Sequence, residues 1–383
     1  MKLSFVSNYI NHHQIPFCNA LYERLGEDFT FIETMPMEEE RLRMGWGVAA
    51  DALSFVRRLY EEEAACRKLI LESDVVILGW TEREDVDMER LESGRLTFRM
   101  SERIYREGRW KMVSPRGLVH KYKEHTRFRN ADAYLLCAGA YVAGDFSMIR
   151  AYPDRMFRFG YFPPVRSYDA DAITAMKAES EDGVRLLYAG RFLELKRPDY
   201  CLRLAGALRD AGMKYKLTMI GDGEQLPAMK QMARELHIED AVEFCGMLPP
   251  EKVRDRMEAA QIFLFPSNHL EGWGAVVNEA MNSACLVVAS NECGAAPFLI
   301  RHKENGLMFR KGSFTDFAEQ VKYGMVHADE RLAMGRAACD TIMKTWNAAA
   351  AAEAFLDVSE KLLRGERDVF LNGDGPMSRA EVI

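Results

Sequence analysis

The chain has 383 residues, 48% of them apolar, and a formal net charge of −7. This length exceeds one ordinary hydrophobic core, so we expect two domains of roughly 150 to 200 residues each. The acidic balance argues against a protein that coats nucleic acid, and no stretch approaches the ~18 apolar residues of a transmembrane helix. The eight cysteines lie in apolar segments without a C-x-x-C pair, which predicts reduced cysteines in the core.

The first half of the sequence alternates short apolar strands with helical patterns. The expected strands are LSFVS (3–7), FTFIE (29–33), VVILG (75–79), LTFRM (96–100) and AYLLC (133–137). This alternation predicts a parallel sheet covered by helices on both faces. The first strand directly follows Met1 and Lys2 with no apolar leader, so we expect a cytoplasmic protein.

A second alternation begins after a break near Phe162 to Pro164. Its expected strands are RLLYAG (185–190), KLTMIG (216–221), VEFCG (242–246), IFLF (262–265) and LVVA (286–289). Two doubly wound domains explain the pattern. They cover residues 1–165 and 184–345, with a linker at 166–183 between them and a helix plus tail at 346–383 that crosses back to the first domain.

Ligands of such sheets bind beyond the carboxyl ends of the strands, so the loops after the second set of strands should converge. One of these loops carries Glu271, and the helix that follows it carries Glu279 eight positions later. Between them, free N–H groups at the start of the helix favour an anion. The two carboxylates could bind hydroxyl groups, and a phosphate site would lie between them. This arrangement suits a sugar nucleotide.

Two further loops of the second half supply candidate contacts. Gly190 allows a tight turn after its strand. Arg191 and Lys196 lie five positions apart in the same loop. The two cations would bind a diphosphate, the alternative being that both are solvated surface charges. Met247 and Leu248 form a short apolar lip that suits a nucleobase edge, the alternative being an ordinary turn.

In the first half, His12 and His13 follow the first strand and would meet a substrate hydroxyl or lie exposed at a helix cap. The two D-x-D pairs, 85–87 and 169–171, do not follow strands, so we assign both to the surface. Without a Cys/His cluster or an H-E-x-x-H motif, we predict no metal site.

A basic stretch runs from residue 95 to residue 129, with eleven Lys or Arg against three Glu. Aromatic residues are interleaved with these charges, namely Tyr105, Trp110, Tyr122 and Phe128. The stretch suits an anionic membrane surface or an anionic acceptor, the alternative being a plain solvated face. Nucleic acid is not the partner we expect.

Four segments between residues 184 and 309 resemble the donor-binding half of the family 4 retaining glycosyltransferases, which have the GT-B fold. They are LLYAGRFLELKRPD, IGDGEQ, VEFCGMLPPEKV and FLFPSNHLEGWGAVVNEAMNSACLVVAS, in this order. The resemblance implies that Arg191 and Lys196 neutralise the donor diphosphate. It further implies that Glu271 contacts the transferred sugar and that Glu279, the second acid of the E-x7-E motif, contacts the ribose.

By the same resemblance, the N–H groups of Gly274, Ala275 and Val276 would hold the distal phosphate, while Met247 and Leu248 would flank the base. The first half departs from the family pattern. A histidine that relatives carry after the fourth strand is replaced by Ser101 and Glu102, so the acceptor-side candidates are His12, His13 and Glu102.

We therefore expect a cytoplasmic, metal-independent hexosyltransferase with two Rossmann-like domains facing across a cleft. It would move a sugar, with retention, from a UDP- or GDP-sugar to a glycan or lipid-linked acceptor in surface polysaccharide or glycolipid biosynthesis. Residues 95–129 would contact the inner face of the membrane, and no cofactor beyond the donor is expected. The alternatives are a GT-B epimerase or hydrolase of sugar nucleotides and a non-catalytic sugar-nucleotide-binding protein.

Overall fold

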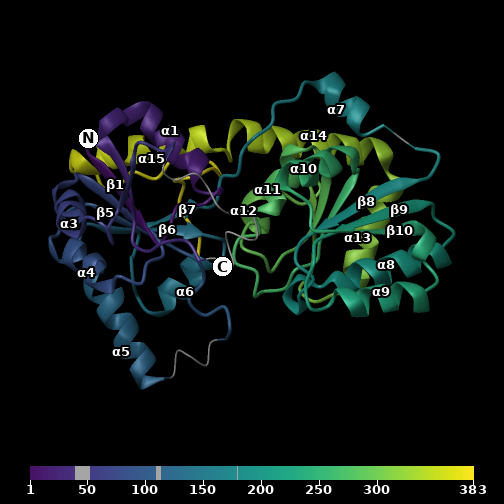
Figure 1. Cartoon of the computed structure of the whole chain (residues 1–383), viewed down its shortest axis with the longest axis horizontal. Coiled ribbons are helices and arrows are strands. Elements are labelled where there is room, and N and C mark those ends of the chain that lie inside the picture. The colour runs from purple at the N-terminus through teal and green to yellow at the C-terminus, as the bar shows by residue number, and fades with distance from the viewer. Residues whose placement is uncertain (39–51, 109–113, 179) are drawn as a thin grey trace. The chain divides into compact units, whose positions relative to one another are not determined.

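The structure, a computed structural model, describes residues 1–38, 52–108, 114–178 and 180–383 (Figure 1). The chain divides into two compact units. Unit 1 contains Met1–Pro164 and Asn347–Ile383, and unit 2 contains Val165–Trp346. Each unit holds one parallel β-sheet with helices packed against it, so the prediction of two Rossmann-like α/β domains is confirmed.

In the described part of unit 1, the sheet has seven parallel strands in the order β3-β2-β1-β4-β5-β6-β7. The strands are β1 (Leu3–Ser7), β2 (Phe29–Glu33), β3 (Val56–Arg58), β4 (Val75–Leu78), β5 (Thr97–Ser101), β6 (Ala133–Ala138) and β7 (Met156–Phe159). The helices are α1 (Ile15–Leu25), α3 (Glu63–Glu72), α4 (Glu84–Glu92), α5 (Pro115–Glu124), α6 (Val142–Met148) and α15 (Ala348–Leu363), with short 3-10 turns η1 (Gly26–Asp28) and η4 (Thr126–Phe128). The strand order reverses between β1 and β4, which is where ligands of doubly wound sheets bind.

Both faces of this sheet are buried because its strands are apolar at successive positions. Val6 faces a core that includes residues of α3, α4 and α6. On the other face, the ring of Phe5 lies 5.1 Å from that of Phe31, and Phe98 lies 4.8 Å from Phe355 of α15. The last helix therefore completes the core of unit 1, as the predicted crossover requires.

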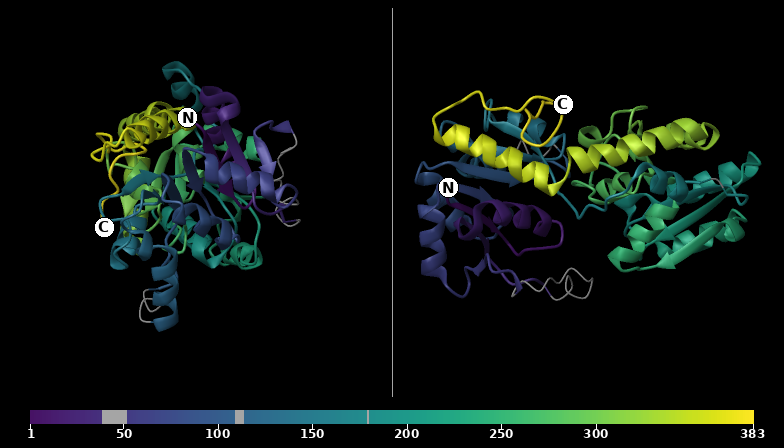
Figure 2. Two further views of the ribbon diagram at one scale, coloured as in Figure 1. Left: turned by 90° about the vertical axis from the view of Figure 1, so that its left-hand side faces the viewer. Right: turned by 90° about the horizontal axis from the view of Figure 1, so that it is seen from above.

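The segment after α15, which shows no pattern in the sequence, pairs with the edge strand β7. The amide of Arg158 donates to the carbonyl of Ser378 at 2.8 Å, and the amide of Ala380 donates to the carbonyl of Met156 at 3.0 Å. Figure 2 shows this segment and α15, both yellow, alongside unit 1. The tail thus satisfies backbone groups that an edge strand would otherwise leave unpaired.

The sheet of unit 2 has six parallel strands in the order β10-β9-β8-β11-β12-β13. The strands are β8 (Val184–Ala189), β9 (Tyr215–Ile220), β10 (Val242–Gly246), β11 (Ile262–Phe265), β12 (Leu286–Ser290) and β13 (Leu307–Phe309). The helices are α7 (Ala170–Met176), α8 (Pro198–Asp210), α9 (Leu226–Glu235), α10 (Pro250–Ala259), α11 (Val276–Asn282), α12 (Ala296–Leu299), α13 (Phe314–Val326) and α14 (Ala328–Lys344), with 3-10 turns η5 (Glu194–Lys196) and η6 (Glu239–Ala241). Leu264 and Val288 belong to a core shared with α8, α9 and α13.

Several features differ from the sequence-based expectations or extend them. The segment 166–183 contains α7 and clusters with unit 2. Strands β3, β7 and β13 have only three or four residues, and two of them carry arginine, so their apolar pattern is too short to recognise. All eight cysteines lie in the described ranges without a disulfide, and all except Cys245 are buried. Among the described residues, no helix combines the length and apolar character that a membrane crossing requires.

Candidate functional site

The loops at the carboxyl edge of the unit 2 sheet are joined by backbone hydrogen bonds. The amide of Gly190 donates to the carbonyl of Ile220 at 3.0 Å, and the amide of Gly221 donates to the carbonyl of Gly246 at 2.8 Å. The loop after β11 is tied to the loop after β8, because the amide of Asn268 donates to the carbonyl of Leu195 at 2.8 Å. The predicted convergence of these loops is therefore confirmed.

Two glycines make this close approach of backbones feasible. Gly221 has a φ of 132°, and a Cβ atom there would lie 2.0 Å from the carbonyl oxygen of Gly190. Gly274 has a φ of 88°, and a Cβ atom there would lie 2.5 Å from the ring of Phe265. Any other residue would push these loops apart or strain the chain.

Lys196 and Glu271 form an ion pair at this edge, although they are 75 positions apart in the sequence. Lys196 ends the 3-10 turn η5, and Glu271 lies in the loop that follows β11. Their side chains are only 17% and 12% exposed, so solvent weakens the pair less than a surface pair. Arg191, from the same loop as Lys196, is exposed. Two of the three residues predicted to be catalytic are therefore in direct contact.

The loop that carries Glu271 is also held by hydrogen bonds from the segment between β12 and α12. The carbonyl of Gly272 accepts from the amide of Gly294 at 3.1 Å, and the carbonyl of Trp273 accepts from the amide of Ala295 at 3.0 Å. The buried indole of Trp273 donates to the side-chain oxygen of Asn278 at 2.9 Å. These bonds hold Glu271 in one position relative to the sheet.

The second acid of the E-x7-E motif lies on α11. This helix begins at Val276, with Ala275 as its N-cap residue and Gly274 directly before it. Burial raises the pKa of Glu279, which is partly buried, and the nearby Arg254 opposes that shift. The Glu279 carboxylate therefore lies in a site where a hydrogen-bond donor would be favourable.

The apolar lip lies at the end of β10. Met247 is 58% exposed and Leu248 is partly buried, directly after Gly246, whose carbonyl accepts from Gly221. Met247 is thus a large apolar side chain in open solvent beside the converging loops. A planar apolar ligand would cover it.

In unit 1, the acceptor-side candidates meet through a residue that sequence reasoning missed. The rings of His12 and His13 lie 3.8 Å apart, and the ring of His13 lies 6.2 Å from that of Tyr161. The Tyr161 hydroxyl donates to Oε1 of Glu102 at 3.1 Å, and Arg106 lies 3.3 Å from Oε2 of the same carboxylate. Tyr161 follows β7 by two residues, so a recognised strand there would have indicated it.

Burial favours the neutral forms of the two histidines and the tyrosine of this cluster. It lowers the pKa of His12, and burial together with His12 lowers the pKa of His13 to about 3. The pKa of Tyr161 is raised well above its usual range by burial and by Glu102. Both imidazoles are therefore neutral at pH 7, each with one nitrogen able to accept a proton or a hydrogen bond.

A second missed residue is Glu33, the last residue of β2. It is 5% exposed, accepts from the amide of Ile10 at 2.9 Å and lies 3.6 Å from Arg58. Burial raises the pKa of its carboxyl, against the effects of that amide and of Arg58. The sequence does contain a signal for this residue, because it is an acid at the end of an apolar strand. Such a position lies at the carboxyl edge of the sheet, where ligands bind.

The assignment of both D-x-D pairs to the surface is wrong for Asp87. Asp85 is exposed and pairs with Arg83 at 2.9 Å, but Asp87 is only 5% exposed. Residues two apart on a helix point in nearly opposite directions, so one acid of the pair faces the sheet. Asp169 and Asp171 are exposed as predicted, and Asp169 caps α7 by accepting from the amide of Ala172 at 2.7 Å.

Part of the basic stretch 95–129, residues 109–113 with Trp110 among them, lies outside the described residues. Of its other aromatic residues, Tyr105 and Phe128 are buried in the core and only Tyr122 is exposed. Tyr122 lies on α5, which has no buried residue and carries Leu118 and Val119 at 44% and 55% exposure. Within the described residues, the exposed large apolar side chains of this stretch are therefore confined to α5. This helix is labelled in Figure 1.

Comparison with known proteins finds similarity in sequence and in fold. Residues 169–340 match the family model described as "Glycosyl transferases group 1". A D-inositol 3-phosphate glycosyltransferase of Saccharomonospora viridis is 30% identical over 203 residues, covering 50% of this chain and 46% of the relative. A GDP-mannose-dependent alpha-(1-6)-phosphatidylinositol monomannoside mannosyltransferase of Mycobacterium tuberculosis is 26% identical over 136 residues, which are 34% of this chain and 35% of the relative. The matched segments span less than half the length of these relatives.

Solved structures resemble the chain over nearly its whole length. HepE of Anabaena in complex with UDP aligns with a TM-score of 0.69 at 12% identity, covering 94% of this chain and 100% of the other. The lipopolysaccharide outer core galactosyltransferase WaaB in its apo form aligns with a TM-score of 0.68 at 16% identity, covering 93% and 98%. The chain therefore has the GT-B fold, and its second unit carries the sequence pattern of the group 1 glycosyl transferases.

Proposed function

We propose that the protein is a retaining glycosyltransferase that moves a sugar from a nucleoside diphosphate sugar to an acceptor in polysaccharide or glycolipid biosynthesis. The observation that carries the proposal is the ion pair between Lys196 and Glu271, formed where the strands of unit 2 end. Both residues lie within the segment that matches the group 1 glycosyl transferases. A cation and a carboxylate in contact suit a ligand that presents a diphosphate beside sugar hydroxyls.

The charges of this site would act on the leaving group. As the glycosidic bond breaks, negative charge grows on the diphosphate, and a preorganised cation stabilises that charge more than it stabilises the bound donor. Lys196 would do this at a fixed position, and the exposed Arg191 would join it when the donor binds. Glu271 holds the ammonium in place and has a carboxylate oxygen for a sugar hydroxyl.

The remaining contacts would follow the family pattern. Gly190 and the N–H groups of Gly274, Ala275 and Val276 would border the phosphates, and Glu279 would accept from the ribose hydroxyls. Met247 and Leu248 would cover the base. HepE was crystallised with UDP, and a mycobacterial relative uses GDP-mannose, so a UDP- or GDP-sugar is the expected donor.

The acceptor would bind at the edge of unit 1. A neutral imidazole of His12 or His13 would accept a hydrogen bond from an acceptor hydroxyl next to the reacting one, and Glu102 would hold Tyr161 in position. A donor phosphate oxygen would take the acceptor proton. A lipid-linked glycan at the inner face of the membrane is the acceptor class we propose.

The exposed apolar residues of α5 support a peripheral membrane contact within residues 95–129. Arg116, Lys121 and Lys123 lie on the same helix and would favour anionic head groups. Binding to vesicles that contain anionic lipid is expected to fall in the double variant Lys121→Glu with Lys123→Glu. Neutral vesicles provide the control, and equal binding of wild type and the double variant to anionic vesicles would contradict the contact.

The donor is tested by the thermal stability of the protein with UDP, GDP, ADP and their sugars. One nucleotide is expected to raise the unfolding temperature, and the rise is expected to shrink in Glu279→Gln. Product analysis then separates the proposed activity from its alternatives. A transferase leaves the donor nearly intact without acceptor and releases the nucleotide with one, whereas an epimerase or hydrolase consumes the donor alone and a binding protein never consumes it.

A further inference from the structure

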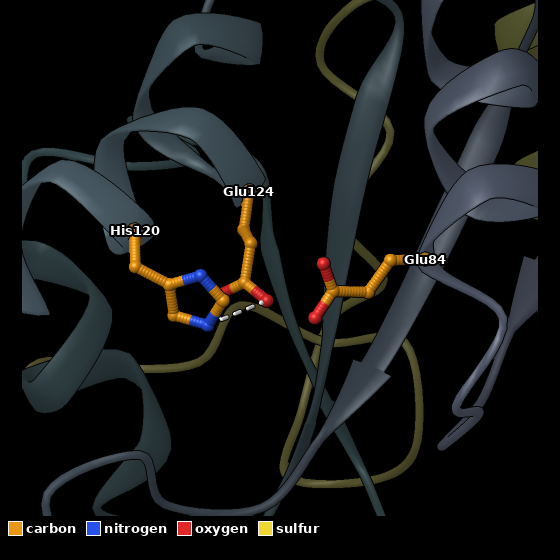
Figure 3. Close-up of side chains that lie close together, drawn as sticks. All are labelled: Glu84, His120 and Glu124. Atoms are coloured by element: carbon orange, nitrogen blue, oxygen red, sulfur yellow. Dashed lines mark ion pairs between the residues drawn. The ribbon is translucent and has the colours of Figure 1, made fainter.

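A histidine and two glutamates from different helices come together on unit 1 (Figure 3). Glu84 lies in the first turn of α4, and His120 and Glu124 lie one turn apart on α5. One ligand atom from each of the three lies within 4.8 Å of the others, and Nε2 of His120 is 3.1 Å from Oε1 of Glu124. An imidazole nitrogen and two carboxylate oxygens form a ligand set that Zn²⁺ accepts.

A buried group beside this cluster points to the same conclusion. Asp87 follows Glu84 by three positions, so both lie on one side of α4. It is 5% exposed, and its Oδ1 atom has no hydrogen-bond partner in the described part of the chain. A buried carboxylate oxygen without a partner is costly and calls for an ion or a water molecule.

The acidic side chains in and around the cluster are only partly balanced by basic ones. Burial raises the pKa of Asp87 to about 7, and Glu84 and Glu124 add to this, while Arg99 opposes it from 4.0 Å. Lys121 contacts Glu124 at 2.8 Å, but through Oε2, so Oε1 remains beside His120. Within the described residues, the lysine or arginine pairs of these three carboxylates are Lys121 with Glu124 and the more distant Arg99 with Asp87.

We propose that Glu84, His120 and Glu124 bind a divalent transition-metal ion of the zinc class, with Asp87 beside the site. Bonds of about 2.0 to 2.2 Å require the ligand atoms to draw closer, which the exposed side chain of Glu84 permits. The ion links α4 to α5, a helix that buries none of its own residues. Its role is to hold α5 in place, and it takes no part in the chemistry at Lys196 and Glu271.

The test uses the full chain after treatment with a chelator and its removal, titrated with Co²⁺ while its visible absorption is recorded. Wild type is expected to develop the bands of a protein-bound cobalt ion, and Zn²⁺ is expected to displace them. His120→Ala and Glu84→Gln are each expected to weaken the affinity at least about tenfold. Both side chains are exposed, so the fold is expected to persist, which circular dichroism checks.

Two matched variants control for non-specific binding. Glu82→Gln makes the same charge change two residues from Glu84. His327→Ala removes an exposed histidine at the N-cap of α14 that also has a glutamate partner, Glu330. Both are expected to bind Co²⁺ as wild type does. Hydrogen exchange of α5 is expected to slow on addition of Zn²⁺ in wild type and in both controls, and to stay unchanged in His120→Ala.

The proposal is overturned if wild type binds no Co²⁺, or if His120→Ala and Glu84→Gln bind it as tightly as wild type. It is also overturned if binding leaves the hydrogen exchange of α5 unchanged. None of these results depends on sugar transfer, so the site stands or falls separately from the proposed activity.

Discussion

The two units expose different chemistry at the carboxyl edges of similar parallel sheets. Unit 2 presents charges, because the Lys196–Glu271 pair and the exposed Arg191 lie among tightly bonded loops. Unit 1 presents two imidazoles and a phenol that burial keeps neutral, because the pKa values of His12 and His13 are lowered and that of Tyr161 is raised. The charged side chains beside them are paired, Glu102 with Arg106 and Glu33 with Arg58. The same fold thus offers one edge suited to an anion and another suited to a neutral hydroxyl.

The largest effect is expected from removing the fixed cation of unit 2, which tests whether the charged edge of that unit binds the diphosphate. Lys196→Ala is expected to lower turnover by ~100-fold or more, by analogy with the loss of one preorganised donor. The measurement is the rate of sugar transfer at saturating donor. Lys230→Ala, which removes an exposed lysine on α9, is the control and is expected to keep full activity. Full activity in Lys196→Ala would sink the proposed role.

The neutral edge of unit 1 predicts a pH dependence of stability. The pKa of His13 is about 3 in the folded chain, against an ordinary value of 6.5, so the unfolded chain binds the proton more readily. The free energy of unfolding should therefore fall as the pH drops from 6.5 toward 3. His13→Gln should reduce this fall by about 1 to 2 kcal/mol at pH 5, after a discount for partial exposure of the ring.

Urea unfolding at pH 5 and pH 8 measures that difference. His327→Gln, at an exposed histidine, is expected to follow the wild-type pH dependence. Identical pH profiles for wild type and His13→Gln would show that the edge of unit 1 does not keep this imidazole neutral.

A smaller effect is expected from the second acid of unit 2. Glu279→Gln should raise the donor KM about tenfold with little change in kcat, because a charged hydrogen bond to the ribose contributes equally before and during the reaction. Initial rates over a range of donor concentrations separate the two constants. Glu319→Gln on α13 provides the control, and a fall in kcat alone would argue against ribose binding.

The smallest expected effect is that of a chelator. If Lys196 and Arg191 neutralise the diphosphate, excess EDTA should leave sugar transfer unchanged well below the unfolding temperature. Loss of transfer in EDTA that Mg²⁺ or Mn²⁺ restores would mean that a metal neutralises the donor, and would remove the contrast between the two edges.

The sequence predicts unit 2 more completely than unit 1 for a physical reason. Gly190, Lys196 and Glu271 follow clear apolar strands, and the carboxyl ends of parallel strands share one edge, so strand order alone brings these loops together. The helix Ala348–Leu363 was also predictable, since its apolar residues recur at helical spacing. The contact between Lys196 and Glu271 is a tertiary detail that spacing does not give.

The missed features depend on burial and on short elements. Tyr161 follows a four-residue strand that ends in a linker-like segment, so nothing marked it as a site residue. Asp87 and Asp85 are equivalent in the sequence, and only the packing of α4 decides which one is buried. The same holds for His120 and Glu84, which come from different helices and meet only in the folded chain.

The division of unit 1 into two stretches of sequence has a consequence for synthesis on the ribosome. Phe355 packs beside Phe17 and Phe98, and the tail pairs with β7, yet unit 2 is made entirely between these pieces. Unit 2 is therefore able to fold while unit 1 still exposes the aromatic face that α15 covers. The nascent chain carries this apolar surface for the time needed to translate about 180 residues, at roughly 5 to 20 residues per second. Chaperone demand should accordingly fall on unit 1, the first part to leave the ribosome and the last to be completed.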